Sequence, residues 1–393
     1  MSFTTIFAAI LLMGWLGSRL AHKIRIPNVL GMLFAGILLG LLFSHNLPES
    51  LIAVEPFLKN FALIVILLRA GLGINRKILK QTGTTAILLS IIPCMLEGAI
   101  LFVAFRYILD FPFAVAGMSA FMLSAVSPAV IVPSMLNFKE LGYSANRQVP
   151  TIVLAGASLD DVFAITMFSI FSRIYLGGAG FGIGDFLRIP FSIVMGILLG
   201  LIFGYMISTL FRRVKQIRAT EKVIVLLGLC LVMIEIGDYM GIASFLGAMT
   251  IGYLLFEREN RIAHEISNKL SKIWIFAEIV LFVLIGMSLN PAYLLDAGLK
   301  GIALILLGLI ARSLGVMLST TGSGLNRKER LFCVISFLPK ATVQAALGTI
   351  PLAMGIAQGN LILALAVMSI MISAPLGLIL IRRYGPYLLG EAG

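Results

Sequence analysis

Two adjacent aspartates, Asp160 and Asp161, lie in the stretch ASLDDVF at residues 157–163, with apolar sequence on both sides. Adjacent residues of a helix point about 100° apart, so one carboxylate can face a cavity while the other leans toward a neighbouring helix. Because two nearby anionic groups repel each other and their charges are costly away from water, at least one is expected to exchange a proton near physiological pH. The pair therefore suits a site that holds either a proton or a hard cation.

The composition places these carboxylates in a lipid bilayer. Of 393 residues, 60% are hydrophobic and only 12% are charged, which is too apolar for a soluble domain of this size. The net charge of +12 does not indicate a nucleic-acid partner, because the basic residues lie between apolar runs and not in one patch. A charge at bilayer depth costs at least ~2.5 to 3.5 kcal/mol, so it is usually functional or paired.

Thirteen apolar segments are long enough to cross about 30 Å of hydrocarbon as helices. The connections are short, and the first segment ends in Arg19 without a small-residue cleavage site, so we expect a retained span and not a signal peptide. The sequence therefore predicts an all-α polytopic membrane protein. The expected spans are 3–20, 27–44, 57–74, 84–108, 112–136, 150–174, 189–211, 221–237, 241–256, 272–290, 300–320, 331–356 and 360–381.

Lysine and arginine placement predicts the orientation. Most of the 30 basic residues follow odd-numbered spans or lie in the tail. Because cytoplasmic loops carry the excess of positive charge, the N-terminus is expected outside and the C-terminus in the cytoplasm. The same bias allows attraction to anionic lipid.

Two spans carry prolines where a membrane helix should be continuous. The fifth contains SAVSPAVIVPSM, with Pro128 and Pro133, and the twelfth contains SFLPKATVQAALGTIP, with Pro339 and Pro351. Proline removes a backbone donor, so both helices are expected to break at membrane depth, where broken backbone must be buried in protein or line a water-filled cavity. Seven spans apart, the two run in opposite directions, as in the inverted repeats of secondary transporters.

Ionisable residues fall beside those breaks. Glu97 lies in the fourth span, Arg312 in the eleventh and Lys340 in the twelfth. Pairing spans four to six with eleven to thirteen places these charges and both aspartates in one six-helix unit. Glu97 with Arg312 can also be read as a purely structural ion pair. Cys94, Cys230 and Cys333 have no short spacing, so they predict neither a zinc site nor a disulfide framework.

Oxygen atoms near the first break suit sodium or lithium. Besides the two carboxylates, the Ser127 hydroxyl and the backbone carbonyl oxygens freed around Val126 and Pro128 are expected to offer oxygen ligands there. The expected ion and proton-exchange residues are thus Asp160 and Asp161, supported by the broken helix.

Several motifs together resemble the sodium/proton antiporters of the cation/proton antiporter superfamily, in the branch with an Asp-Asp pair (NHA-type). VSPAVIVPSML, GASLDDVFAI and LPKATVQAALG are similar to the core motifs of that family, and IRIPNVLGMLFAGILLG and ILLRAGLGIN are similar to weaker ones. The resemblance covers nearly the whole chain. It implies an NhaA/NapA-like antiporter fold, with about thirteen transmembrane helices and two broken crossing helices, in a homodimer whose core slides against a dimerisation domain.

The resemblance also implies a division of the single transporter unit and roles for its charges. Asp161 is similar to the principal ion ligand of the family and Asp160 to its partner. Arg312 stands where electrogenic bacterial members have a lysine; arginine stays charged in proteins, so a pair with Glu97 is expected, while Lys340 compensates helix-end dipoles. The expected core covers 84–174 and 300–381, the dimerisation domain 1–74 and 221–290, and a linker helix with a cytoplasmic connector 189–222.

The expected function is exchange of Na⁺ or Li⁺ for H⁺ by an elevator-type movement that is electroneutral and serves pH homeostasis, in a prokaryotic plasma membrane. Alternatives are an electrogenic exchanger of two protons per sodium, a cation channel and an organic-solute symporter. An intramembrane aspartyl protease would need a second suitable aspartate besides Asp185 of GFGIGD, and none follows a tyrosine within a span. Neither an enzyme activity nor a resident cofactor nor a nucleic-acid partner is expected. Membrane lipid is the expected partner besides a second copy of the chain.

Overall fold

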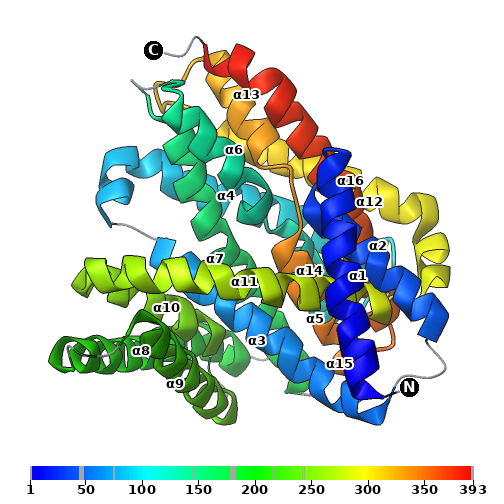
Figure 1. Ribbon diagram of the computed structural model, residues 1–393. Helices are drawn as coiled ribbons and strands as arrows, with labels where there is room; N and C mark the ends of the chain where they lie inside the picture. The colour runs from blue at the N-terminus through cyan, green and yellow to red at the C-terminus, as the bar shows by residue number, and fades with distance from the viewer. Residues whose placement is uncertain are drawn as a thin grey trace. The chain divides into compact units, whose positions relative to one another are not determined.

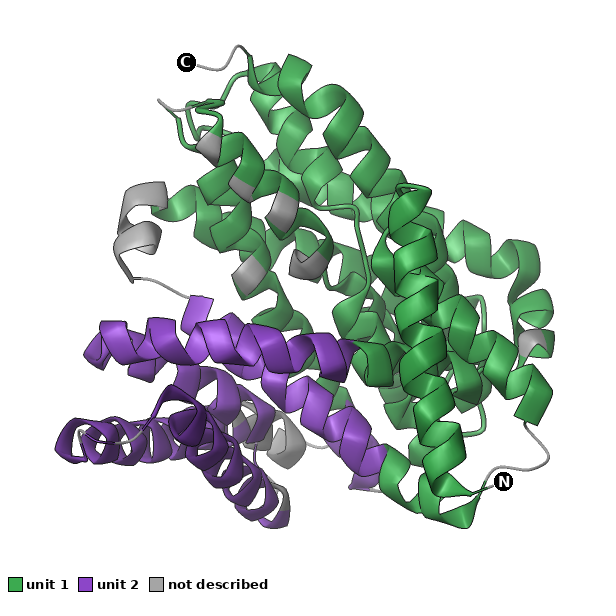
Figure 2. Cartoon of the chain, in the orientation of Figure 1, with its two compact units in different colours: residues 1–55, 79–171, 279–393 green, residues 56–78, 172–278 purple. Residues whose placement is uncertain are grey.

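The computed structural model shows a chain built from helices joined by short turns and loops (Figure 1). Residues 2–43, 48–73, 76–144, 147–177, 183–214, 216, 218–240, 242 and 244–390 are described. They fall into two compact units (Figure 2): unit 1 comprises 1–55, 79–171 and 279–393, and unit 2 comprises 56–78 and 172–278.

Unit 1 contains most of the helices. Their bounds are α1 (Phe3–Lys23), α2 (Asn28–Phe43), α4 (Arg76–Tyr107), α5 (Phe113–Ser124), α6 (Pro128–Glu140), α7 (Val149–Leu176), α12 (Pro291–Ser319), α13 (Arg327–Ser336), α14 (Thr342–Gly348), α15 (Ile350–Ala353) and α16 (Gly359–Leu389). Unit 2 contains α8 (Ile183–Arg213), α9 (Ala219–Tyr239) and α10 (Ser244–Arg258). The helices α3 (Glu49–Gly73) and α11 (Asn260–Ser288) are divided between the two units, and α4 and α7 also extend into unit 2, with residues 76–78 and 172–176.

The prediction of an all-helical polytopic membrane protein is confirmed. Within the described residues, 8 helices are long and apolar enough to cross a membrane, and shorter apolar helices occur as well. Each expected span coincides with one helix or with a broken set of helices. The match follows from the bilayer, where an apolar segment satisfies its backbone hydrogen bonds locally by forming a helix.

Two glycines set the start of the regular spans α4 and α12. Gly83 has φ 65° and ψ −158°, and Gly298 has φ 40° and ψ −136°. These positive φ angles are accessible to glycine because it has no Cβ. The continuous parts of both helices therefore begin at the positions where the sequence predicted spans 84–108 and 300–320.

The first broken segment lies between α5 and α6. The α5 helix ends at Ser124, Ala125 is extended with ψ 144°, and Pro128 restarts the chain as α6. Proline fits this position because the first N–H of a helix has no partner within it. Pro133, the other proline of this span, lies inside α6 and does not end it.

The second broken segment lies between α13 and α14. The α13 helix ends at Ser336, and α14 starts at Thr342 after non-helical residues that include Pro339 and Lys340. Pro351 lies in the first turn of α15 and so begins a helix. Both interruptions thus lie where the proline-containing motifs predicted them.

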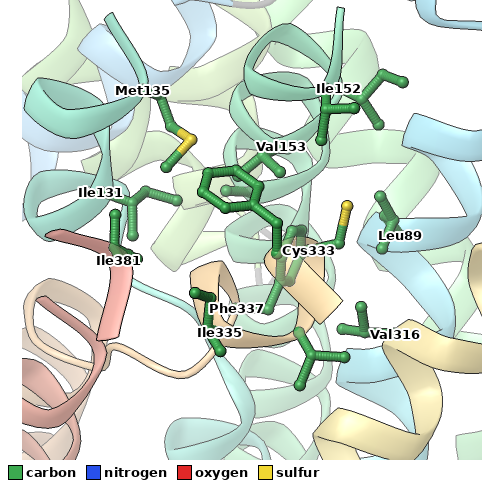
Figure 3. Packing of buried hydrophobic residues seen from close by; sticks show 14 of the residues in the cluster. Leu89, Ile131, Met135, Ile152, Val153, Val316, Cys333, Ile335, Phe337 and Ile381 are labelled. Carbon is green, nitrogen blue, oxygen red and sulfur yellow. The ribbon is translucent and has the colours of Figure 1, made fainter. Parts of the chain in front are cut away.

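A cluster of buried apolar side chains packs the ends of both broken segments together (Figure 3). The α6, α7 and α13 helices contribute Ile131, Val153 and Cys333, all fully buried. Phe337, at the start of the second break, lies in the same cluster. Further members are Leu89, Met135, Ile152, Val316, Ile335 and Ile381. Because this core is close-packed, it fixes both breaks in position.

In unit 2, the glycine stripe GILLGLIFG of α8 packs against α10. A Cβ added to Gly200 would lie 2.5 Å from the Gly247 carbonyl oxygen, and one added to Gly204 would lie 3.3 Å from Ile251 Cα. The small residues thus allow close contact between helices of the same chain.

Candidate functional site

The two broken segments touch each other inside unit 1. The Ser127 N–H donates to the Pro339 carbonyl oxygen at 2.8 Å, and the hydroxyl oxygens of Ser127 and Thr342 lie 3.4 Å apart. Backbone released from one helix is thus partly satisfied by the other, as buried backbone requires. Pro128 adds the start of α6 beside this contact; its side chain lies outside the described part of the chain.

The α7 helix brings its two aspartates to the first break. Both are buried, with exposed fractions of 0% for Asp160 and 4% for Asp161. Asp160 Oδ2 accepts the Val126 N–H at 2.8 Å. Asp160 is therefore bound to backbone that the interruption of the helix set free.

Arg312 of α12 joins Asp160 to Glu97 of α4. Its Nε donates to Glu97 Oε2 at 2.5 Å, while Nη1 and Nη2 donate to the two oxygens of Asp160 at 3.2 and 3.3 Å. The guanidinium fork matches the carboxylate geometrically, as in bidentate pairs generally. The sequence suggested the contact with Glu97, whereas the contact with Asp160 was not anticipated.

Lys340 occupies the second break and reaches the end of α5. Its Nζ donates to the Leu123 carbonyl oxygen at 2.6 Å and forms an ion pair with Glu97 Oε1 at 2.7 Å. The last carbonyls of a helix lack intrahelical partners and carry partial negative charge. The ammonium group thus contacts both a helix C-terminus and a carboxylate.

Asp161 differs from the other four charges. Among the described residues, its buried Oδ1 has no hydrogen-bond partner, and no ion pair within 4 Å joins its side chain to a cation. Glu97, Asp160, Arg312 and Lys340 form two carboxylates balanced by two cations. Asp161 is the fifth charged residue and the third carboxylate; it has no balancing cation, and a proton or a monovalent cation would neutralise it.

Sequence reasoning missed two contributors to this site. Gln344 of α14 is fully buried and donates to carbonyl oxygens of the first broken segment. Gly308 of α12 lies against Glu97, since a Cβ there would be 2.8 Å from Glu97 Oε1. Helical spacing could not have indicated Gln344, because Lys340, four residues before it, lies in the non-helical break and not on α14.

The chain matches the family described as sodium/hydrogen exchanger, transmembrane, over residues 7–383. It belongs to this family. Human sodium/hydrogen exchanger 9B2 is 32% identical over 382 residues, which cover 93% of this chain and 70% of that protein. The 9B2 protein of Xenopus tropicalis is 30% identical over 408 residues, covering 98% of this chain and 74% of that protein. The resemblance inferred from the motifs is thereby confirmed.

The antiporter fold of this exchanger-family chain is also seen in a solved structure. The sodium proton antiporter MjNhaP1 from Methanocaldococcus jannaschii, at pH 8, superposes with a TM-score of 0.82. The match covers 99% of this chain and 98% of that one at 20% identity. At this identity the likeness concerns the fold, and the chain is therefore a multi-pass membrane protein with an antiporter fold.

Proposed function

We propose that this chain exchanges Na⁺ for H⁺ across a membrane, with Asp161 carrying the exchanged ion or proton. The observation that supports this most directly is the charge balance of the site. Two carboxylates and two cations surround the break and engage one another, whereas Asp161 is buried with one oxygen unpartnered. A buried carboxylate without a cation binds a neutralising charge strongly, and H⁺ and Na⁺ then compete for it.

Asp160 has a supporting role in this proposal. Its two oxygens are held by Arg312 and by the Val126 N–H, so it stays anionic and fixed while its neighbour changes state. The Val126 N–H contacts Asp160, and in this proposal the Ser127 hydroxyl and the carbonyl oxygens around Val126 and Pro128 supply the hard oxygen ligands that Na⁺ or Li⁺ prefers.

The same balance predicts one proton per sodium. Arg312 is permanently charged, and in this proposal its pairing with Glu97 and Asp160 does not change through the cycle. Only Asp161 then changes its occupant. One half-cycle carries one Na⁺ across the membrane and the other carries one H⁺ in the opposite direction, so transport is electroneutral. The alternative of two protons per sodium requires Lys340 or Asp160 to titrate as well.

Transport by this site requires alternating access. We propose that the core, 84–174 and 300–381, carries the site across the membrane in an elevator-like movement against a dimerisation domain, 1–74 and 221–290, with 189–222 as the linker. The supporting observation is that all five charges of the site lie within the residues of this core, four of them on helices and Lys340 in the second break. A homodimer, the N-terminus outside with the C-terminus in the cytoplasm, and a prokaryotic plasma membrane complete the proposal.

The test is performed with purified protein in liposomes containing a pH-sensitive dye. An imposed Na⁺ gradient should drive proton movement in the opposite direction, and Li⁺ is tested in parallel. Absence of coupled pH change with every alkali cation would refute the exchange, and a passive cation current without proton coupling would favour a channel.

A further inference from the structure

The peptide unit that joins Ala125 to Val126 is held from both of its edges. Its N–H donates to Asp160 Oδ2 at 2.8 Å, and its carbonyl oxygen accepts a hydrogen bond from Gln344 Nε2, also at 2.8 Å. The N–H and C=O of a trans peptide point in opposite directions within one rigid plane. Asp160 and Gln344, from two different helices, therefore fix the orientation of one plane between them.

This peptide lies in the extended backbone of the first break, between the end of α5 and the start of α6. Ala125 has φ −74° and ψ 144°, and Ser127 has φ −98° and ψ 107°, both extended. In an intact helix, the bonds along the axis would fix the plane. In the break, the side chains of Asp160 and Gln344 fix the orientation of the peptide plane instead.

The carboxamide of Gln344 is itself firmly held. Nε2 lies within hydrogen-bond distance of three carbonyl oxygens at the end of α5 and in the break, those of Met122 at 3.1 Å, Leu123 at 3.4 Å and Ala125 at 2.8 Å. Three acceptors around one atom require that atom to be the donor nitrogen and not the amide oxygen. Oε1 then points elsewhere; it is buried and has no hydrogen-bond partner among the described residues.

We infer that Gln344 is a positioning residue that sets cation affinity through the 125–126 peptide. Holding the Ala125 carbonyl keeps the Val126 N–H directed at Asp160, and this keeps Asp160 aligned with Arg312 and leaves Asp161 as the carboxylate that is free to bind. Without the Gln344 bond, the peptide plane can rotate about its flanking torsions. The donor to Asp160 and the arrangement of the oxygens beside the aspartates are then lost together. This inference rests on the proposed exchange of Na⁺ for H⁺.

The variant Gln344→Met tests the inference, because methionine has similar length but no donor. Proton movement driven by Na⁺ is measured in liposomes at a series of Na⁺ concentrations. We expect the half-saturating Na⁺ concentration to rise about tenfold while the maximal rate per folded protein changes less than twofold. Ser119→Ala is the matched control: Ser119 is also fully buried, on α5, and its hydroxyl donates to Val115 O of its own helix. This control should keep the half-saturating concentration of the original protein.

If a variant transports too slowly for its half-saturating Na⁺ concentration to be measured, its Na⁺ affinity is measured by thermal unfolding instead. Na⁺ raises the melting temperature of a protein that binds it, so the Na⁺ concentration needed for half of that rise reports affinity in detergent. In an Asp160→Asn background, Gln344→Met should have little further effect, because the carboxylate through which it acts is gone. Gln344→Asn keeps a donor on a shorter side chain and replaces Gln344→Met if the latter does not fold; a loss of affinity is expected for it too.

The outcomes separate this inference from the proposed function. If the unsubstituted protein does not exchange Na⁺ for H⁺, the proposed function fails. If it does, and the folded Gln344 variants keep its half-saturating Na⁺ concentration, Gln344 does not position the site. A lower maximal rate or melting temperature with unchanged affinity would assign Gln344 a structural role only and would also overturn the inference.

Discussion

Arg312 binds both carboxylate oxygens of Asp160, with Nη1 at 3.2 Å from Oδ1 and Nη2 at 3.3 Å from Oδ2. Asp161, the next residue, has an oxygen with no hydrogen-bond partner among the described residues. Two neighbouring aspartates are thus placed in opposite electrostatic situations, because consecutive side chains of α7 point in different directions. One is compensated by a fixed cation, and the other is left for a mobile one.

Asp161→Asn should abolish coupled transport. The substitution removes the negative charge that H⁺ and Na⁺ share, and we expect a drop of at least about 100-fold in Na⁺-driven proton movement, given an electrostatic contribution of about 3 kcal/mol or more. The melting temperature should not fall, because an uncompensated buried charge disappears. Asp160→Asn is the comparison: it should lower the melting temperature, because Arg312 loses an anionic partner. Near-normal Na⁺ affinity in Asp161→Asn would contradict the assignment.

Glu97 and Arg312 should be energetically coupled. Glu97→Gln or Arg312→Gln alone leaves the four-charge cluster unbalanced, a cost on the order of 3 to 5 kcal/mol. The double replacement leaves Asp160 and Lys340, which still balance, so it should cost less than the sum of the single changes. Thermal unfolding of the four proteins in detergent gives the coupling free energy, expected at about 0.5 to 3 kcal/mol. Strictly additive losses would show that the two residues act independently.

Gly308→Ala should disturb the ion pair of Glu97 with Lys340. The added Cβ would lie 2.8 Å from Glu97 Oε1, the oxygen that faces Lys340. Either the carboxylate or the helix must shift, at a cost of about 1 to 3 kcal/mol, visible as a lower melting temperature. Gly228→Ala on α9 is the control, since a Cβ there meets nothing within 4 Å, and should be neutral or slightly stabilising. Equal melting temperatures for both variants would argue against close packing at Gly308.

Transport should not respond to the membrane potential. With potassium and valinomycin clamping the potential of liposomes at different values, the rate and end point of Na⁺-driven proton movement are expected to stay the same, because one Na⁺ replaces one H⁺ at Asp161. A rate and end point that follow the potential would instead support two protons per sodium. The Lys340→Gln variant then identifies the source of the second proton, since it should restore indifference to the potential if Lys340 carries it.

The sequence by itself determined the helices and the residues of the candidate site that carry charge. Each apolar segment of sufficient length becomes a helix, because in a bilayer both its burial and its hydrogen bonds are local properties. The prolines and the polar residues around Pro128 and Lys340 located the two breaks, because the loss of a backbone donor at proline is also a local property. The sequence did not decide which of Pro128 and Pro133 marks the first break; α6 begins at Pro128 and continues through Pro133.

The pair of Glu97 with Arg312 was expected, but only the tertiary structure decided which other charges meet. Arg312 is 215 residues from Glu97 and 152 from Asp160, and its choice between the aspartates depends on how α4, α7 and α12 are rotated about their axes. The contacts of Lys340 with Leu123 and of Gln344 with the 125–126 peptide depend likewise on the crossing of two breaks. Hydrogen bonds and ion pairs at 2.5 to 3.3 Å require sub-ångström placement of distant segments, which hydrophobic periodicity does not encode and close packing of the core does.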